Sequence, residues 1–250
     1  MPIDFGRHSD DYATFRPGFP DSFYDRLDRL AELNGRRVLD IATGPGVIAF
    51  ELARRGCAVT GTDISAQQIE AAISRAGLRD VAFKVEPAEQ TSFDNDTFDM
   101  VTAGQCWHWF DQVRVLHEIR RVLRPKGHLV IGYYSYLAKL SPIVSATESL
   151  VLSLNPQWDM ANSDGMYPQI VDQVCLNGFQ LVEQFCTHHS EPFSHERWRG
   201  RMRTCNGVGS GGMAPETVAA FDHQLAIMLE PFPEPMDIPH RLWCIVAQKT

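Results

Sequence analysis

Hydrophobic and polar residues follow two alternating patterns along the first half of the chain. Short apolar runs predict buried strands, and stretches with an apolar side chain every three or four positions predict amphipathic helices. The predicted strands are Val38–Ile41, Ala58–Thr62, Val81–Val85, Phe98–Ala103 and His128–Tyr134. The predicted helices are Asp21–Leu33, Val47–Arg55, Ser65–Ala76 and Asp111–Leu123. Strands separated by helices indicate right-handed crossovers and a largely parallel sheet.

The second half has a weaker pattern. It predicts the helices Gly165–Asn177, His195–Cys205 and Pro215–Leu229, the loop Gly207–Met213, and the strands Phe179–Cys186 and Leu242–Lys249. A length of 250 residues suits a single α/β domain that carries insertions. We therefore expect one domain over residues 1–250.

The segment from Val38 to Asp63 predicts a site for an adenosine-containing cofactor. It reads as a strand, a turn with Gly44 and Gly46, a helix, and a second strand that ends at Asp63. Glycines leave no Cβ to block a ligand, and amides at a helix N-terminus attract anionic groups. A carboxylate at the position of Asp63 can accept hydrogen bonds from both ribose hydroxyls.

The identity of the cofactor is a separate question, because Gly44-x-Gly46-x-x-Ala49 followed by Asp63 also satisfies the dinucleotide pattern. A nicotinamide-dependent oxidoreductase therefore stays an alternative. Asp40 at the strand end, Ala88-Glu89 after the third strand and the segment 105–111 after the fourth favour S-adenosylmethionine.

Several motifs resemble those of class I S-adenosylmethionine-dependent methyltransferases, and more narrowly the branch that contains trans-aconitate methyltransferase. They are Tyr12-x-x-x-Arg16-Pro-Gly-Phe-Pro20, the turn from Asp40 to Gly46, Gly61-x-Asp63-x-Ser65, Ala88-Glu89, His108-Trp-Phe-Asp111 and Leu123-Arg-Pro-Lys-Gly127. The resemblance covers residues 8–135. It implies a Rossmann-like, mostly parallel seven-stranded sheet whose last strand is antiparallel, with insertions at 136–165 and 190–213 that form a helical cap.

The resemblance also implies which residues bind S-adenosyl-L-methionine and release S-adenosyl-L-homocysteine. They are Tyr12, Arg16, Asp40, Ala42, Gly44, Gly46, Asp63, Ile64, Ala88, Glu89 and Gln105. Two positions depart from the family pattern. Ala42 replaces a glycine, which is tolerated if its φ is negative. Pro87 replaces an aspartate, so Glu89 or a backbone group would have to bind the adenine amino group.

A sulfonium methyl carbon is already a good electrophile, so the enzyme mainly has to align the acceptor and exclude water. Trp107 and Trp109 are candidates to face this cation. Of the aromatic residues in the motif, Trp109 and Phe110 are the ones we expect in the core. His108 could act as a general base or orient a loop by a backbone hydrogen bond, and a carboxylate acceptor needs no base.

Four arginines between Arg197 and Arg203 suggest an anionic substrate, against the alternative of a solvated face. On a helix, Arg197 and Arg201 share one face and Arg199 and Arg203 another, so at most one pair faces a ligand. The expected substrate contacts are Trp107, His108, Tyr133, Tyr136, Trp158, Trp198 and Arg199.

Charge and composition reduce the classes of substrate and partner that the protein can have. A net charge of −8 argues against a nucleic-acid substrate. No apolar stretch is long enough to span a bilayer, and the start of the chain lacks the apolar core of a signal peptide, so we expect a cytoplasmic protein. No metal motif is present, and Cys106 is the cysteine to test for reactivity.

Taken together, the sequence predicts a methyltransferase that acts on a carboxylate or hydroxyl of a small molecule. The alternatives are the oxidoreductase and a cofactor-binding module without catalytic activity. The oligomeric state stays open.

Overall fold

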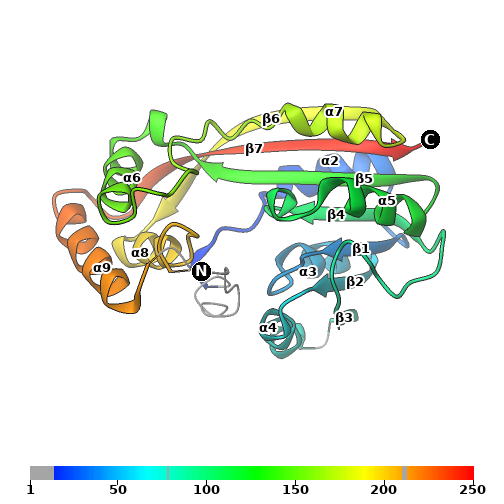
Figure 1. Ribbon diagram of the computed structural model, residues 1–250, viewed down its shortest axis with the longest axis horizontal. Helices are drawn as coiled ribbons and strands as arrows, with labels where there is room; N and C mark the ends of the chain where they lie inside the picture. The colour runs from blue at the N-terminus through cyan, green and yellow to red at the C-terminus, as the bar shows by residue number, and fades with distance from the viewer. Residues whose placement is uncertain (1–13, 78, 210–212) are drawn as a thin grey trace. The chain divides into compact units, whose positions relative to one another are not determined.

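The computed structural model describes residues 14–77, 79–209 and 213–250 (Figure 1). Its strands form one seven-stranded sheet in the order β3-β2-β1-β4-β5-β7-β6. The strands are β1 (Arg37–Ile41), β2 (Ala58–Asp63), β3 (Val81–Val85), β4 (Phe98–Gly104), β5 (Leu123–Tyr136), β6 (Phe179–Phe193) and β7 (Met236–Lys249). The sheet is mostly parallel and β7 is antiparallel, which confirms the predicted fold class.

The helices are α2 (Asp21–Ala31), α3 (Val47–Arg54), α4 (Ala66–Ala76), α5 (Gln112–Val122), α6 (Pro142–Leu154), α7 (Gln169–Leu176), α8 (His195–Arg203) and α9 (Pro215–Leu229). Two short 3₁₀ helices, η1 (Trp107–Trp109) and η2 (Ala138–Leu140), follow β4 and β5. Side-chain caps begin several helices: Ser65 for α4, Asp111 for α5, Ser141 for α6 and Ser194 for α8 accept a hydrogen bond from a first-turn amide.

The register of the sheet brings the ends of three strands together. Asp40 on β1 lies opposite Gly61 on β2 and Thr102 on β4, and both pairs are parallel. Because the carboxyl ends of parallel strands share one edge, the turn after β1 and the segments after β2 and β4 meet there. This edge is the place where an open α/β sheet binds ligands.

By its contacts the chain divides into two compact units. We call Gly18–Tyr134, Tyr167–Cys186 and Leu242–Thr250 the sheet unit, and Met1–Pro17, Ser135–Met166 and Thr187–Arg241 the helical unit. Strands β5, β6 and β7 each contribute residues to both. The prediction that residues 136–165 and 190–213 cover the cofactor stays a prediction.

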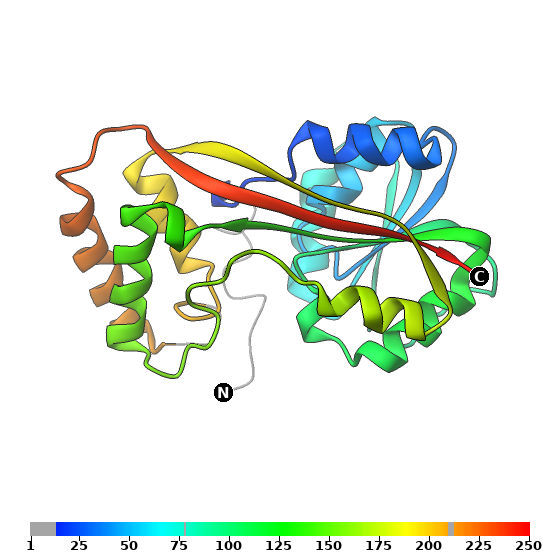
Figure 2. The same cartoon turned by 90° about the horizontal axis from the view of Figure 1, so that it is seen from above.

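Each unit has its own hydrophobic core. In the sheet unit, α2 covers one face of the sheet, and α5 and α7 lie on the other (Figure 2). Leu27 and Leu33 pack there with Val38, Leu52 and Val246. In the helical unit, α6, α8 and α9 contribute to a second core that surrounds the fully buried Trp198 and Phe221.

Three features of the second half differ from the sequence prediction, and one is that strand β7 begins at Met236, before the predicted start at Leu242. Helix α6 was not predicted, although Ser141 and Pro142 form an N-cap and first turn. Strand β6 continues to Phe193, beyond the predicted end at Cys186, because its side chains keep alternating between more and less exposed positions. Within the described residues, no helix is both long and apolar enough to cross a membrane.

Candidate functional site

The turn after β1 adopts left-handed backbone angles at three positions. φ is 48° at Ala42, 55° at Gly44 and 83° at Gly46. The backbone amide of Thr43 donates to Thr62 O at 2.9 Å, which fixes the turn against β2. The condition of a negative φ at Ala42 is therefore wrong. A left-handed conformation costs a residue with a Cβ about 1–2 kcal/mol.

The two glycines of the turn have different roles. A Cβ built on Gly46 would lie 2.8 Å from the Phe50 ring, so packing inside the unit requires glycine there. Among the described residues, a Cβ on Gly44 would meet Gln68 Oε1 alone, at 3.9 Å. No described side chain therefore blocks the approach of a ligand to the backbone at Gly44.

Asp40 is 1% exposed and stabilises the turn through its carboxyl group. Its Oδ2 accepts a hydrogen bond from Thr43 Oγ1 and its Oδ1 accepts one from Thr102 Oγ1, each at 2.6 Å. Burial raises the pKa of Asp40 to about 6, and the charge of Asp63 adds to this effect against the two hydroxyl donors. The carboxyl group thus joins β1, the turn and β4.

Asp63, at the end of β2, is 7% exposed. Its Oδ2 accepts from the backbone amide of Gly44 and its Oδ1 accepts from that of Ser65, both at 2.9 Å. Burial raises the pKa of Asp63, although these amides and that of Ile64 favour the charged form. A carboxylate has about four lone-pair sites, so about one acceptor position remains beyond these three amides.

The residues after β2 and β3 complete this edge of the sheet. Ile64 is 68% exposed, which leaves an apolar side chain uncovered next to Asp63. Ala88 is buried, and Glu89 Oε1 accepts from the backbone amide of Asp111 at 3.1 Å. Glu89 therefore ties the segment after β3 to the start of α5.

Gln105 lies at the end of β4 with a φ of 63°. Its backbone amide donates to Gly132 O at 2.9 Å, and its side-chain Nε2 donates to Tyr134 O at 2.5 Å. The second bond holds the side chain against β5, and it gives no support to a contact between this side chain and a cofactor.

In the aromatic motif after β4, the buried and the exposed tryptophan are the reverse of the prediction. Trp107 is 1% exposed and contacts Phe110 edge-on, with ring centroids 5.9 Å apart. Trp109, which was expected in the core, is 38% exposed. The prediction for Trp109 is wrong, and the reason is local: η1 turns the chain, so Trp107 points inward toward Gln173 and Trp109 outward.

His108 lies in the same short helix and contacts β5. Its Nδ1 is 3.1 Å from the hydroxyl oxygen of Tyr133. Tyr133 is buried and stacks on Tyr167, with ring centroids 3.9 Å apart. Of the predicted substrate contacts in the sheet unit, His108 is the one with an exposed side chain.

Four further predicted substrate contacts lie in the helical unit, and three of them are aromatic. Trp158 and Trp198 belong to its core, where their indole groups donate to Asn206 Oδ1 at 3.0 Å and to Thr147 Oγ1 at 3.1 Å. Tyr136 is partly buried and contacts Trp198 edge-on at 5.4 Å. The burial of both tryptophans gives no support to a direct contact with a substrate.

The arginines of α8 divide as their spacing predicts. Arg199 and Arg203 both bind Asp222 of α9, the latter through Nη1 at 2.8 Å. Arg199 is thus engaged in a structural ion pair. Arg197 lies over the Phe193 ring at 4.5 Å, and the buried Arg201 lies over Tyr136 at 5.1 Å.

Of the two N-terminal residues expected at the cofactor, Tyr12 lies outside the described residues. Arg16 donates from Nε to Thr204 Oγ1 at 3.0 Å and from Nη2 to Thr204 O at 2.8 Å. Its guanidinium group therefore holds the residue that ends α8. The predicted pairing of Arg16 with the methionine carboxylate stays a prediction.

Sequence reasoning missed Thr43, Thr102 and Tyr167. Thr102 could be found only from the register of β1 and β4, which sets it beside Asp40. Tyr167 precedes α7 and meets Tyr133 through the fold alone. Thr43 stood inside the predicted turn, and a hydroxyl three residues after a buried acid was the available signal.

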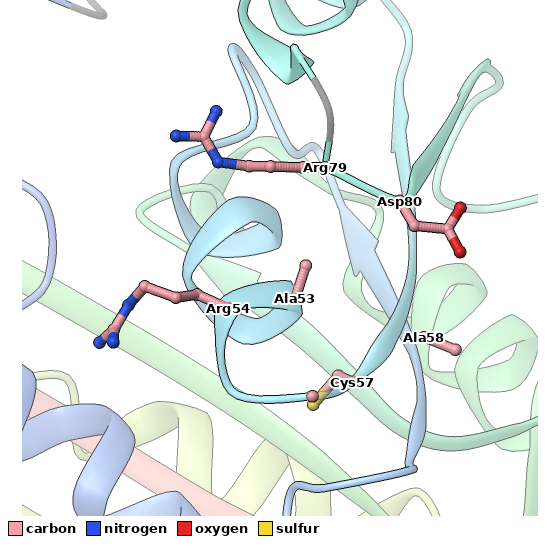
Figure 3. Close-up of a pocket in the computed structure, with 7 residues that line it drawn as sticks. Ala53, Arg54, Cys57, Ala58, Arg79 and Asp80 are labelled. Carbon is pink, nitrogen blue, oxygen red and sulfur yellow. The ribbon is translucent and has the colours of Figure 1, made fainter.

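Two other features of the described residues do not add a site. A depression near the start of β2 is lined by the apolar residues Ala53, Cys57 and Ala58, and the side chains of Arg54 and Arg79 extend to one side of it while that of Asp80 extends to the other (Figure 3). No cluster of described side chains could hold a metal ion. Burial raises the pKa of the Cys106 thiol well above its usual range, which argues against a reactive thiolate.

Comparison with known proteins gives the site a context. Residues 39–131 match the family described as a methyltransferase domain. The chain is 33% identical over 129 residues to an uncharacterized methyltransferase of Mycobacterium tuberculosis. The aligned region covers 52% of this chain and 51% of that protein. It is 36% identical over 119 residues to a ubiquinone biosynthesis O-methyltransferase of Alkalilimnicola ehrlichii, and this alignment covers 43% of this chain and 47% of that protein. The chain spans about half the length of the curated relatives it matches.

A solved structure shows the same fold. Phosphoethanolamine N-methyltransferase 2 of Haemonchus contortus, in complex with phosphomonomethylethanolamine and S-adenosylhomocysteine, is 21% identical. The match covers 96% of this chain and 56% of that chain, with a TM-score of 0.56. The chain is thus similar to a methyltransferase domain over residues 39–131 and shares the fold of a methyltransferase, and the trans-aconitate branch stays a prediction.

Proposed function

We propose that this protein transfers a methyl group from S-adenosyl-L-methionine to an oxygen of a small molecule. The observation that carries the proposal is the backbone at Gly44, which no described side chain covers and which is bordered by the buried carboxyl groups of Asp40 and Asp63. All three belong to the sheet unit and lie at the edge where parallel strands end.

The residues present fit the parts of this cofactor. The remaining acceptor position of Asp63 suits a ribose hydroxyl. The exposed side chain of Ile64 provides an apolar surface for the adenine ring. The space beside Gly44 accommodates close approach of the ligand to the turn.

Charge favours S-adenosylmethionine over a dinucleotide. Asp40 and Asp63 lie close enough for the charge of one to raise the pKa of the other. Two acids under one turn repel a pyrophosphate and attract the ammonium and sulfonium groups of the methyl donor. The dinucleotide pattern also contains an acid at the end of the second strand, so Asp63 does not distinguish the two cofactors. Asp40, inside β1, is the acid that favours S-adenosylmethionine.

The bound cofactor would supply an electrophilic methyl carbon. The chain's own residues then have to bind the cofactor, position the acceptor and exclude water. Trp109, with 38% of its surface exposed, could offer an aromatic face to the positive charge.

The acceptor is proposed to be a carboxylate or a hydroxyl. The O-methyltransferase relative supports oxygen, whereas the structural neighbour is an N-methyltransferase. The net charge of −8 supports a small molecule over a nucleic acid. The cytoplasmic location stays a prediction.

The test has two stages. Calorimetric titration of the full chain should show binding of S-adenosyl-L-methionine and S-adenosyl-L-homocysteine, and binding of NAD alone would overturn the proposal. Incubation with methyl-labelled cofactor and a panel of carboxylates, phenols and amines should then label an oxygen acceptor. Binding without transfer to any acceptor would favour the non-catalytic module.

A further inference from the structure

Asp40 and Asp63 form a pair of buried acids beside the turn after β1, and both belong to the sheet unit. Asp40 accepts hydrogen bonds from neutral hydroxyls and Asp63 from backbone amides. In the described part of the chain, no lysine or arginine pairs with either acid. A buried negative charge without a cation is costly. The pair can therefore hold two charges only when a cation binds nearby, and otherwise one acid is better protonated.

The hydrogen-bond partners indicate which acid takes the proton. The amides of Gly44 and Ser65 that bind Asp63 can only donate, so they favour its ionised form. The partners of Asp40 are the hydroxyls of Thr43 and Thr102, each at 2.6 Å. A hydroxyl can accept as well as donate, so a protonated Asp40 keeps a partner for its proton. Asp40 is therefore the acid that can change its protonation state without losing its contacts.

The electrostatic surroundings of Asp40 agree with this assignment. Burial and the charge of Asp63 raise the pKa of Asp40 to about 6, against the two hydroxyl donors. Two further titratable groups are coupled to it, Tyr24 on α2 and Cys106 after β4. Burial and the charge of Asp40 raise the pKa of both groups far above their usual values, and the charge of Asp63 adds to the effect on Cys106. Both groups are therefore neutral near pH 6 and supply no compensating charge.

We propose that Asp40 is the residue by which this site distinguishes the sulfonium of the methyl donor from the thioether of the product. It does so through a proton that Asp40 loses when the donor binds and regains after methyl transfer. The inference rests on the proposed function, which places the cofactor beside Gly44. The positive charge of the donor there takes the place of the proton as the partner of the two acids.

The charges balance over one turnover. The bond between the methyl carbon and sulfur breaks, and its electron pair stays on sulfur, which becomes neutral. A carboxylate acceptor becomes a neutral ester, so the site loses one positive charge and Asp40 takes a proton from solvent. Donor and product carry the same ammonium group, so that group does not contribute to the difference between them. At neutral pH the ionised pair of acids therefore binds the donor more tightly than the product.

The direct test is calorimetric titration of the full chain at about pH 6, in buffers of different ionisation enthalpy. The dependence of the binding enthalpy on the buffer counts the protons released. S-adenosyl-L-methionine should release up to about half a proton, because about half of Asp40 is protonated at a pH equal to its pKa. S-adenosyl-L-homocysteine should release distinctly less. The amino group of either ligand is already protonated at this pH.

The affinities should show the same linkage. Binding that releases a proton strengthens as pH rises, so the ratio of donor affinity to product affinity should increase about fivefold or more between pH 5 and 7.5. The ratio removes effects that the two ligands share, such as a contact between Asp63 and the ribose.

Three variants assign the proton. Asp40→Asn should abolish the release at about pH 6 and make the affinity ratio independent of pH. Thr102→Val keeps the shape of the side chain but removes one hydroxyl donor, so the release should move to higher pH by about one unit. Asp80→Asn, in the residue before β3, is the matched control and should behave as the wild type.

The outcomes separate this inference from the proposed function. Equal proton release with donor and product, or release that persists in Asp40→Asn, would overturn the inference and leave the proposed function standing. An unchanged release profile in Thr102→Val would also overturn it, even where Asp40→Asn does not fold. Binding of neither ligand by the wild type would contradict the proposed function itself.

Discussion

At the scale of single residues, the turn after β1 contains a strained backbone conformation at Ala42. Ala42 is held at a φ of 48°, in the region that glycine occupies without strain. The strain persists because hydrogen bonds fix the residues on either side, through Thr43 to β2 and through Asp40 to β4. No described side chain blocks the backbone of the neighbouring Gly44.

Replacing Ala42 by glycine should stabilise the protein by up to about 1 kcal/mol. Relief of the left-handed conformation contributes about 1–2 kcal/mol, and the greater freedom of glycine in the unfolded chain removes about half of it. Urea unfolding of Ala42→Gly measures the difference. Ala53→Gly, inside α3, is the matched control and should destabilise by about 1 kcal/mol. Destabilisation by both variants would contradict the backbone geometry at Ala42.

Replacing Asp63 by alanine should weaken binding of S-adenosyl-L-homocysteine by about 1–3 kcal/mol, which is about 5- to 150-fold in affinity. The change removes the acceptors for the ribose and the bonds to the Gly44 and Ser65 amides. Calorimetric titration gives the affinity. Asp80→Ala is the control, because this acid precedes β3 at the far end of the strand and points outward (Figure 3). Wild-type affinity in Asp63→Ala would remove the residue from the site.

At the scale of elements, the arginines of α8 connect two helices. Asp222 of α9 accepts hydrogen bonds from both Arg199 and Arg203. Burial alone would raise the pKa of Asp222, but these hydrogen bonds outweigh it and lower the pKa. The basic run that suggested a substrate site therefore works in part as an ion-pair network within the helical unit.

Asp222→Ala should lower the free energy of unfolding by about 1–2 kcal/mol at neutral pH, since the group is partly shielded from solvent. Because the folded pKa is lowered, this contribution is present above the unfolded pKa and is lost as pH falls through the folded value. Denaturant unfolding at neutral and acidic pH should show the difference shrinking with acid. Glu216→Ala, at the exposed start of α9, should change stability by less than about 0.5 kcal/mol.

At the scale of the whole molecule, stability should respond to the protonation of Asp40. Burial raises its pKa to about 6, so the folded state holds the proton more tightly than the unfolded chain. As pH rises from about 4 to about 6, the unfolded state loses the proton first and native stability falls by about 3 kcal/mol. Above about pH 6 this contribution is constant.

Comparing wild type with Asp40→Asn isolates the effect. Asparagine can keep both threonine contacts, because a hydroxyl can accept from its amide as well as donate. The difference in unfolding free energy between the two proteins should change between pH 4 and 6 and stay level above that range. A difference independent of pH would show that Asp40 is not the group that titrates.

The pattern of apolar residues determined the elements of the first half and their parallel order. Glycine spacing and the acids at strand ends then pointed to the cofactor edge of the sheet, because these signals are local in sequence. The second half was less predictable. Polar residues such as His188 and Glu191 lie within β6, where alternation along the strand matters more than composition.

The sequence by itself thus determined the strand–turn–helix around Gly44 and Gly46, since backbone freedom and hydrophobic periodicity are properties of neighbouring residues. Only the tertiary structure decided the contacts between distant residues. It set Thr102 beside Asp40, buried Trp107 instead of Trp109, and engaged Arg199 with Asp222. These outcomes depend on which side chains the fold brings within a few ångströms, and spacing along the chain does not carry that information.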